Sequence, residues 1–344
     1  MLLDIIIPIY NAEKYLPELF ESLKAQTMQD YNLYLVDDCS TDKSIDIILE
    51  QKDYFQNRIH VFHSLHNSGP AIARNIALDN RKECSEFVMF IDADDSFENQ
   101  YFEKMVNAAE KYNADMIICG LDRKDENGKV LCREMINNPE EIITDISKCD
   151  VLGYMVPVLW NKLFRNSCIG QQRFPDAARS EDTVFIFKIL PDIKSIKFVN
   201  QVLYHYTIRE KSMTGAYTEE MHHTMLNAFA VLKEVYDSDS KYEQYRELLE
   251  LQMFIRCAVG GTYRLAFKNM KKIFWYEKKS REFLNTIFPD WRKNGYISFN
   301  KFYRKSLKQN LISICALLYK LHLFSLFIAA YWLMNKAIKK DIRF

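Results

Sequence analysis

An apolar run at residues 87–91 ends abruptly in a cluster of acids, and this step constrains the fold more than any other part of the chain. The run reads Phe-Val-Met-Phe-Ile and is followed by Asp92-Ala93-Asp94-Asp95. Apolar residues with aromatic and β-branched members are typical of a strand buried on both faces, as in a parallel sheet. Open α/β sheets bind their ligands at the carboxyl edge of their strands. The sequence therefore predicts a central strand that brings its carboxylates to a ligand-binding edge.

The chemistry of this acidic turn favours a cation. Neighbouring carboxylates raise one another's pKa unless a positive charge lies among them. Oxygen ligands on one turn suit Mg²⁺ or Mn²⁺, which take one or two carboxylates and complete their shell with water and phosphate oxygens. The alternative is an acidic turn that caps the next helix, because Asp commonly follows a strand. The position at the end of a central strand favours a metal-phosphate site.

Short apolar runs alternate with amphipathic segments through the first part of the chain. Strands are expected at 4–9, 33–36, 59–62, 87–91 and 116–119, and helices at 12–25, 44–51, 71–78 and 100–112. This alternation predicts an α/β fold in which helices flank a mostly parallel sheet. Asn11, and either Thr41 or Asp42, are expected to cap the first two helices. A turn signal at 126–129 predicts antiparallel pairing beyond the fourth helix.

Beyond about residue 219 the strand pattern fades and long helical segments follow, so we expect one domain at 1–217 and a helical region at 218–344. From Thr262 to the end the chain has 18 basic and four acidic residues, a net charge of +14 within a chain whose formal net charge is zero. A basic arm on an acidic body is typical of a protein that meets an anionic surface. No nucleic-acid-binding motif accompanies the charge, so nucleic acid is not an expected partner.

The basic region also contains an apolar stretch from Leu311 to Met334. Its uninterrupted part, Leu323 to Met334, falls short of the ~20 apolar residues that cross a bilayer. With basic residues on both sides, 301–344 suits peripheral contact with an anionic membrane, and the alternative is a helical pair packed on the protein itself. Scattered cysteines and the lack of a leader-like start favour a cytoplasmic protein, peripheral on the inner face of the cell membrane.

The distribution of glycine excludes several enzyme classes. The chain has nine glycines, and the first is Gly69, so the turn after the first strand contains none. Dinucleotide-binding folds, P-loop enzymes and sugar-nucleotide-synthesising nucleotidyltransferases all use a glycine-rich turn there. These classes are therefore disfavoured.

Four further segments carry polar residues that the acidic turn requires as partners. They are Val36-Asp37-Asp38 at the end of the second strand, Ala73-Arg74-Asn75 at the start of a helix, Glu181-Asp182 before an apolar helix, and Tyr204-His205-Tyr206 leading to Arg209. In this order the chain resembles the family 2 glycosyltransferases of the GT-A fold. The resemblance covers about residues 3–214 and rests on IIIPIYNAEKYL, LVDDCSTD, NSGPAIARN, FIDADD and the acids of EDTVF. The family more often has Gly at position 39, so Cys39 must form that turn with a side chain.

The resemblance implies an inverting transfer of a hexose or N-acetylhexosamine from a UDP-sugar to a hydroxyl of a glycan or lipid-linked acceptor, in surface or capsular polysaccharide synthesis. Asp38 would accept the uracil N3–H, Asp92 would hold the ribose, and Asp94 would bind Mn²⁺ or Mg²⁺. Arg74 would lie against the nucleotide, and Asp182 matches the family's general base. A non-catalytic partner of another transferase, binding a nucleotide sugar or glycan, is the alternative.

Chemical reasoning supports these roles independently. A metal and an Arg stabilise the charge that grows on a diphosphate leaving group. A sugar hydroxyl is a poor nucleophile, so a carboxylate must take its proton, an effect that contributes ~10²–10⁴ in rate. Inversion requires that base to lie opposite the leaving group, and therefore on a segment remote in sequence from the acidic turn. Asp182 meets this requirement. The alternative is that Glu181 and Asp182 are first-turn acids that complement a helix dipole.

Several other residues are expected near the donor. Pro8, Tyr10 and Arg209 are predicted to contact the nucleotide sugar, and His205 is predicted as a metal ligand beside Asp94. His205 and Arg209 are equally compatible with ordinary edge-strand positions. Trp160 and Lys162 also match the resemblance, although a Trp is usually a core residue.

Overall fold

The computed structural model of the chain describes residues 1–81, 84–135, 142–176, 180–209, 217–297 and 307–338. The chain forms two compact units, one made of Met1–Lys148 and Pro157–Gly215 and the other of Cys149–Val156 and Ala216–Phe344. A short segment from the first half of the chain thus belongs to the second unit. The expectation of two domains divided at residues 217 and 218 stays a prediction.

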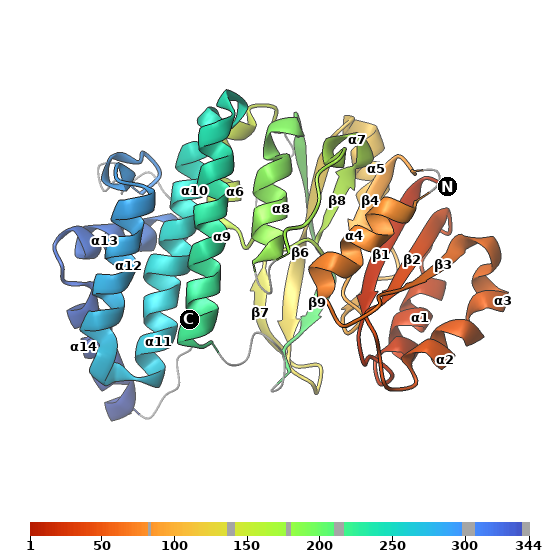
Figure 1. Cartoon of the computed structure of the whole chain (residues 1–344), viewed down its shortest axis with the longest axis horizontal. Coiled ribbons are helices and arrows are strands. Elements are labelled where there is room, and N and C mark those ends of the chain that lie inside the picture. Colours follow the sequence, from red (N-terminus) through yellow and green to blue (C-terminus); the bar gives the residue numbers. More distant parts are fainter. Residues whose placement is uncertain (82–83, 136–141, 177–179, 210–216, 298–306, 339–344) are drawn as a thin grey trace. The chain divides into compact units, whose positions relative to one another are not determined.

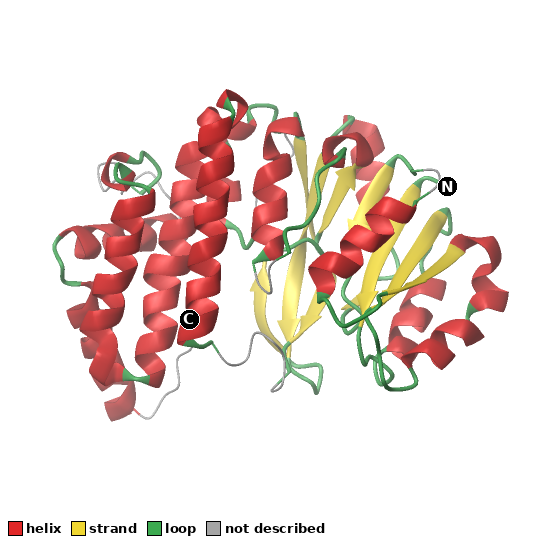
Figure 2. Ribbon diagram, in the orientation of Figure 1, coloured by secondary structure: helices red, strands yellow, loops and turns green. Residues whose placement is uncertain are grey.

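The first unit is built on a mixed β-sheet (Figure 2). Its strands are β1 (Leu3–Ile9), β2 (Tyr31–Asp37), β3 (Ile59–His63), β4 (Phe87–Phe90), β5 (Ser96–Phe97), β6 (Met116–Lys124), β7 (Val130–Glu134), β8 (Lys162–Arg165) and β9 (Ile196–Thr207). They lie in the order β3-β2-β1-β4-β8-β6-β9-β5, and β7 pairs with β6.

Pairing within the sheet changes direction at β8. The neighbours β3, β2, β1 and β4 are parallel, with Leu3 of β1 opposite both Tyr31 and Phe87. Strand β8 then runs antiparallel to both β4 and β6, whereas β6 and β9 are parallel. The four residues of β4 are buried, as expected of a strand with helices on both faces. The predicted fold class, a mostly parallel α/β sheet followed by a helical region, is confirmed.

Helices cover both faces of the sheet (Figure 1). They are α1 (Leu16–Lys24), α2 (Ser44–Glu50), α3 (Lys52–Phe55), α4 (Pro70–Asn80), α5 (Tyr101–Tyr112), α7 (Asn166–Ile169) and α8 (Glu181–Ile189). Helix α1 buries Leu16, Leu19, Phe20 and Leu23, whose spacing of three and four residues places them on one side of the helix. Helices α1 and α5 both pack on one face of the sheet. Helices α4 and α8 cover the other face, where Phe185 of α8 meets Phe90 of β4 at 5.7 Å between ring centroids.

The expected helix caps are corrected by contacts between the first two strand-to-helix loops. Helix α1 begins at Leu16, not at Ala12, and Asn11 does not cap it. Instead, the backbone N–H of Thr41 donates to Asn11 Oδ1 at 2.8 Å. Asp42 accepts from the backbone N–H of Ser44, the first residue of α2, and from that of Glu13, both at 3.0 Å. These hydrogen bonds therefore join the loop that follows β1 to the loop that follows β2.

The second unit is helical. Its helices are α6 (Asp150–Tyr154), α9 (Glu219–Ser238), α10 (Arg246–Met253), α11 (Thr262–Lys268), α12 (Ile273–Ile287), α13 (Leu307–Lys320) and α14 (Phe324–Ile338), and the π-helix Phe254–Gly261 joins α10 to α11. No single described helix is long and apolar enough to cross a bilayer. By length and composition, only the stretch Gln309–Lys320 taken together with Phe324–Met334 qualifies, and these two segments are bent by 120°.

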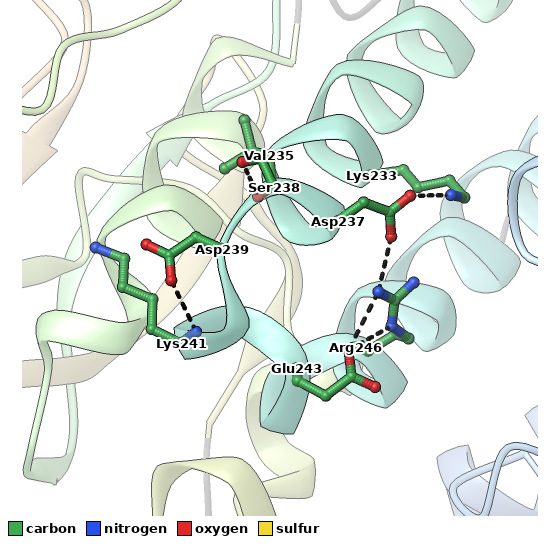
Figure 3. Close-up of polar contacts among 8 residues, drawn as sticks. All are labelled: Lys233, Val235, Asp237, Ser238, Asp239, Lys241, Glu243 and Arg246. Carbon is green, nitrogen blue, oxygen red and sulfur yellow. Dashed lines mark hydrogen bonds and ion pairs between the residues drawn. The ribbon is translucent and has the colours of Figure 1, made fainter.

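The turn from α9 to α10 is held by polar contacts near the surface (Figure 3). Arg246 donates to Asp237 at 2.7 Å and to Glu243 at 3.2 Å. Asp239 accepts from the backbone N–H of Lys241 at 2.9 Å. One guanidinium thus links the end of α9 to the start of α10.

The turn after β2 contains a strained residue. Cys39 has a φ of +66° and an exposed side chain, so the turn has the left-handed conformation that glycine adopts without a steric penalty. The expectation that Cys39 forms this turn with a side chain is confirmed.

We predict that Cys39→Gly raises the free energy of unfolding by about 0.5–1 kcal/mol. The change removes a Cβ penalty of about 1–2 kcal/mol in the left-handed region, and glycine's greater freedom in the unfolded chain offsets part of the gain. Urea denaturation measures the difference. Cys39→Ala, which removes the thiol and keeps the Cβ, is the control and should leave stability unchanged. Equal effects of the two substitutions would contradict a conformational cause.

Candidate active site

A buried arginine joins three carboxylates at the carboxyl edge of the sheet. Arg74 of α4 is 3% exposed. Its guanidinium donates to Asp92 Oδ1 at 2.9 Å, to Asp182 Oδ1 at 3.2 Å and to Glu181 Oε1 at 3.4 Å. The ring of Phe174 lies 5.5 Å from the guanidinium carbon. Two acidic segments that are remote in sequence, 92–95 and 181–182, therefore meet at one side chain.

Negative charge exceeds positive charge in this cluster. Burial, together with the charges of Glu181 and Asp92, raises the pKa of Asp182 to about 7, although Arg74 and Lys162 act in the opposite direction. The carboxylate is therefore close to the point where it can accept a proton at neutral pH. Both acids of the first turn of α8 direct their carboxylates to Arg74, which favours a role at the site over a contribution to helix capping alone.

Lys162 at the start of β8 is a second buried cation in the first unit. Its side chain is fully buried, and Nζ donates to the carbonyl of Val158 at 2.6 Å and to Asn161 Oδ1 at 2.8 Å. Burial lowers the pKa of Lys162 to about 7. Trp160, by contrast, is a core residue that stacks on Tyr204 and Tyr206 at 4.7 and 5.3 Å between ring centroids.

The acidic turn itself is bound to the chain that follows β9. Arg209 donates to the carboxylate and to the carbonyl of Asp94, and its guanidinium carbon lies 4.2 Å from the ring centroid of Tyr15. Burial and the charge of Asp92 raise the pKa of Asp94, and Arg209 partly opposes this. The structure thus brings together Asp94 and Arg209, two residues predicted at the donor.

Asp95 faces the protein interior. Tyr204 Oη donates to Asp95 Oδ2 at 2.8 Å, and the backbone N–H of Thr207 donates to Oδ1 at 3.1 Å. Burial, followed by the charges of Asp92 and Asp94, raises the pKa of Asp95 well above its usual value. Both oxygens accept hydrogen bonds from β9, so Asp95 anchors the acidic turn to that strand.

Asp38 lies at the carboxyl end of β2 and faces the start of α4. It is 2% exposed, and its carboxylate accepts from the backbone N–H of Ser68 at 2.9 Å and of Gly69 at 2.6 Å. Gly69 has a φ of +84°, which a glycine adopts without strain. Of the other residues predicted at the donor, Pro8 is partly buried in β1 and Tyr10 is 50% exposed just beyond it.

His205 is not brought to the acidic turn. Its Nε2 lies 2.9 Å from Glu98 Oε1, and its Nδ1 lies 4.0 Å from Asp122 Oδ2. The side chain lines a separate cleft of about 790 Å³ with Glu98, Asp122 and Arg133. Successive side chains of a strand point to opposite sides, so when Tyr204 reaches Asp95, its neighbour is directed elsewhere. We therefore correct the expectation that His205 is a metal ligand beside Asp94.

Asp92 and Asp94 are the residues that could hold a cation. In each carboxylate one oxygen is bound by an arginine, and the side chains are 30% and 40% exposed. Within the described ranges no group of three or more His, Cys, Asp or Glu side chains forms a metal cluster. The carboxylates of Asp92 and Asp94 fit an ion that binds one or two carboxylates and completes its coordination shell with phosphate and water, as Mg²⁺ and Mn²⁺ do.

Sequence reasoning missed the aromatic residues of the site. The ring of Phe174 packs against the guanidinium of Arg74, and the ring of Tyr15 packs against that of Arg209. The hydroxyl of Tyr204 donates to Asp95. Phe174 belongs to no motif, and Tyr15 lies within the motif IIIPIYNAEKYL, where no role was assigned to it. The contacts of both residues depend on tertiary structure. Tyr204 was visible only as part of an aromatic segment that precedes Arg209.

Comparisons with known proteins identify the family to which the chain is similar. The model of the family described as Glycosyl transferase family 2 matches residues 4–160. The chain is 30% identical over 263 residues to the putative glycosyltransferase EpsH of Bacillus subtilis (strain 168), an alignment that covers 73% of each protein. It is 27% identical over 266 residues to the poly(ribitol-phosphate) beta-glucosyltransferase of Bacillus spizizenii, covering 74% of this chain and 40% of that protein.

A solved structure shares the fold along most of the chain. The crystal structure of S. aureus TarS 1-349 in complex with UDP-GlcNAc superimposes with a TM-score of 0.69 and 20% sequence identity. The superposition covers 96% of this chain and 91% of the TarS chain. At this identity the likeness establishes the fold alone.

We predict that Arg74→Met lowers the free energy of unfolding by about 3–5 kcal/mol at mildly alkaline pH, because it leaves buried carboxylates without their partner. The deficit should shrink at mildly acidic pH. Unpaired, buried carboxyl groups have raised pKa values in the folded state, so the stability they contribute is present when they are protonated and is lost as pH rises.

Urea denaturation at the two pH values measures this change. Arg74→Lys is the control because it keeps the charge, and it should show a smaller deficit with little dependence on pH. A deficit of Arg74→Met that does not vary with pH would contradict the electrostatic explanation.

Proposed function

The chain belongs to glycosyl transferase family 2, and on this premise we propose that it is an inverting enzyme that transfers a hexose or N-acetylhexosamine from a UDP-sugar to a hydroxyl group of a glycan or lipid-linked acceptor. The observation that carries the proposal is the shared contact of Arg74 with Asp92 and Asp182. It places the acidic turn expected to hold the donor directly beside the carboxylate expected to act as base.

The donor side of the proposal involves β2, α4 and the acidic turn. Asp38 and Asp92 would bind the nucleoside, Pro8 and Tyr10 would border it, and Arg209 would lie near the diphosphate beside Asp94. The complex of TarS with UDP-GlcNAc supports a UDP-sugar. The relative that glucosylates poly(ribitol-phosphate) supports an acceptor that is a cell-surface polymer.

Asp182 would act as the general base. As the acceptor oxygen attacks the anomeric carbon, its proton passes to the Asp182 carboxylate, and the bond from the anomeric carbon to the diphosphate oxygen breaks. A base with a pKa near the operating pH is the most effective, and burial raises the pKa of Asp182 to about 7. Arg74 would keep Asp182 and Asp92 in fixed positions and balance part of their charge.

We assign the divalent cation, Mn²⁺ or Mg²⁺, to Asp94, with Asp92 beside it. Such an ion supplies electrostatic stabilisation of the diphosphate that leaves. Its charge would also offset the burial and repulsion that raise the pKa values of Asp94 and Asp95. Arg209, which binds the Asp94 carboxylate in this structure, would contact a phosphate in place of that carboxylate when Asp94 binds the ion.

The enzyme is proposed to work in the cytoplasm, peripherally on the inner face of the cell membrane. The net charge of +14 from Thr262 onward and the apolar stretch within 301–344 support this location. Within the region 301–344, residues 301–306 and 339–344 lie outside the described residues. Contact with the membrane would bring the site to a lipid-linked acceptor.

We predict that Asp182→Asn lowers donor turnover by about 10²–10⁴, the usual contribution of a general base, and leaves the affinity for UDP within about twofold. The amide keeps the shape of the side chain and cannot take a proton. Sugar release from UDP-sugars and UDP binding by calorimetry measure the two effects. Glu181→Gln is the matched control and should retain most of the turnover. Normal turnover in Asp182→Asn would exclude this residue as the base.

We also predict that turnover requires Mn²⁺ or Mg²⁺ and is abolished by EDTA until the metal is restored. Asp94→Asn should raise the metal concentration for half-maximal activity about tenfold or more, since even outer-shell changes reduce metal affinity about 10–100-fold. Asp46→Asn, at an exposed position of α2, is the control. Full activity in the presence of chelator would overturn the assignment of the metal and leave the assignment of the base intact.

A further inference from the structure

The outward face of α14 is apolar as far as Met334. The exposed positions on the helix and just before it are Leu323, Leu326, Phe327, Ala330, Leu333 and Met334, which we call the outer stripe. Five of these side chains are 41–59% exposed. Their spacing of three and four residues places them on one side of the helix, where a soluble protein normally presents polar residues.

The opposite face of α14 is buried within the second unit and fixes the direction of the outer stripe. Phe324, Ser325 and Ile328 are at most 4% exposed. The backbone N–H of Ser325 donates to Glu277 Oε2 of α12 at 2.8 Å, and Arg281 donates to Glu277 Oε1 at 2.7 Å. A buried carboxylate at the start of a helix complements its dipole, so the first turn of α14 is firmly attached.

Aromatic and basic side chains accompany the outer stripe. The hydroxyl of Ser325 donates to the carbonyl of Ile273 at 3.3 Å, which brings the start of α14 against the start of α12 (Figure 1). The next two residues of α12, Phe274 and Trp275, are 59% and 47% exposed. Lys271 and Lys272, just before α12, are also exposed. Trp beside Lys is typical of a protein segment at the headgroup level of a membrane.

We infer that the outer stripe, together with Phe274 and Trp275, docks on the surface of a bilayer that contains anionic phospholipids. The described helices do not span a bilayer individually, so α14 lies in the plane of the interface with its apolar side inserted. Lys271, before α12, meets the headgroups, whereas its neighbour Lys272 is paired with Glu219 at 2.9 Å. The inference rests on the proposed function only in that a lipid-linked acceptor explains why the enzyme needs this contact.

Charge favours a membrane over a second copy of the chain. A two-fold dimer through this face would place the same basic surface on both sides. Among the described residues from Thr262 onward the acids are Glu277, Glu282 and Asp290, and Glu277 is buried. Few carboxylates are therefore available to pair with the lysines of a partner copy, whereas anionic lipid supplies the missing charge.

The test is sedimentation of the full chain with phosphatidylcholine vesicles that contain or lack phosphatidylglycerol. The protein should bind the anionic vesicles, and added salt should weaken binding. Leu326→Ser combined with Phe327→Ser should lower the vesicle affinity about tenfold or more. Each substitution removes the favourable free energy of transferring an apolar side chain from water into the bilayer. Leu49→Ser combined with Val231→Ser is the matched control, because these residues are 44% and 43% exposed elsewhere, and it should bind as the parent does.

Each result decides the inference. The inference is supported if the parent and the control variant bind the anionic vesicles and the α14 double variant does not. Lack of binding by the parent, or unchanged binding by the α14 variant, would overturn it. So would a parent that is dimeric in solution and becomes monomeric in the α14 variant, since the outer stripe would then join two copies. Release of sugar from UDP-sugars in water, measured in parallel, tests the proposed function separately and should be unchanged in both double variants.

Discussion

The structure of the site depends on one buried guanidinium. Arg74 holds Asp92, Glu181 and Asp182 at 2.9–3.4 Å, and without it these carboxylates would repel one another in a poorly solvated environment. The arginine comes from a helix, and its partners come from the end of a strand and the start of another helix. A single cation therefore links two segments to which the proposed mechanism gives different substrates.

That arrangement also explains why the acidic edge remains electrostatically unsatisfied. Five carboxylates gather there, at positions 92, 94, 95, 181 and 182, and Arg74 and Arg209 together bind four of them. Burial raises the pKa values of Asp94, Asp95 and Asp182. The protein supplies less positive charge than its own acids require. Such a deficit supports the proposal that the site binds a divalent cation together with a nucleotide. It also leaves a carboxylate that is ready to accept a proton.

Local patterns predicted the scaffold, and tertiary contacts decided the rest. The strand at 87–90 and the helix that starts at Glu181 were predictable because burial and periodicity are properties of short segments. That Asp92 and Asp182 serve one site followed only from the family resemblance. Arg74 was predicted to lie against the nucleotide, and its contact with both carboxylates was not predicted. Asn11 was predicted to cap a helix because its residue type suits a cap, but its side chain accepts a hydrogen bond from Thr41 in the neighbouring loop. His205 was misplaced because the direction of a strand residue depends on a register that the sequence does not reveal.

The contacts that close the acidic edge link positions far apart in the chain. Arg74 and Asp182 are separated by 108 positions, Asp95 and Tyr204 by 109, and Asp94 and Arg209 by 115. Contacts of such separation carry a high closure entropy and form late in folding. During translation, the carboxylates at 92–95 leave the ribosome long before the residues that bury them. The nascent chain therefore passes through a stage in which its acids are hydrated and separate, and it acquires its charged pocket only when synthesis of the first unit is nearly complete.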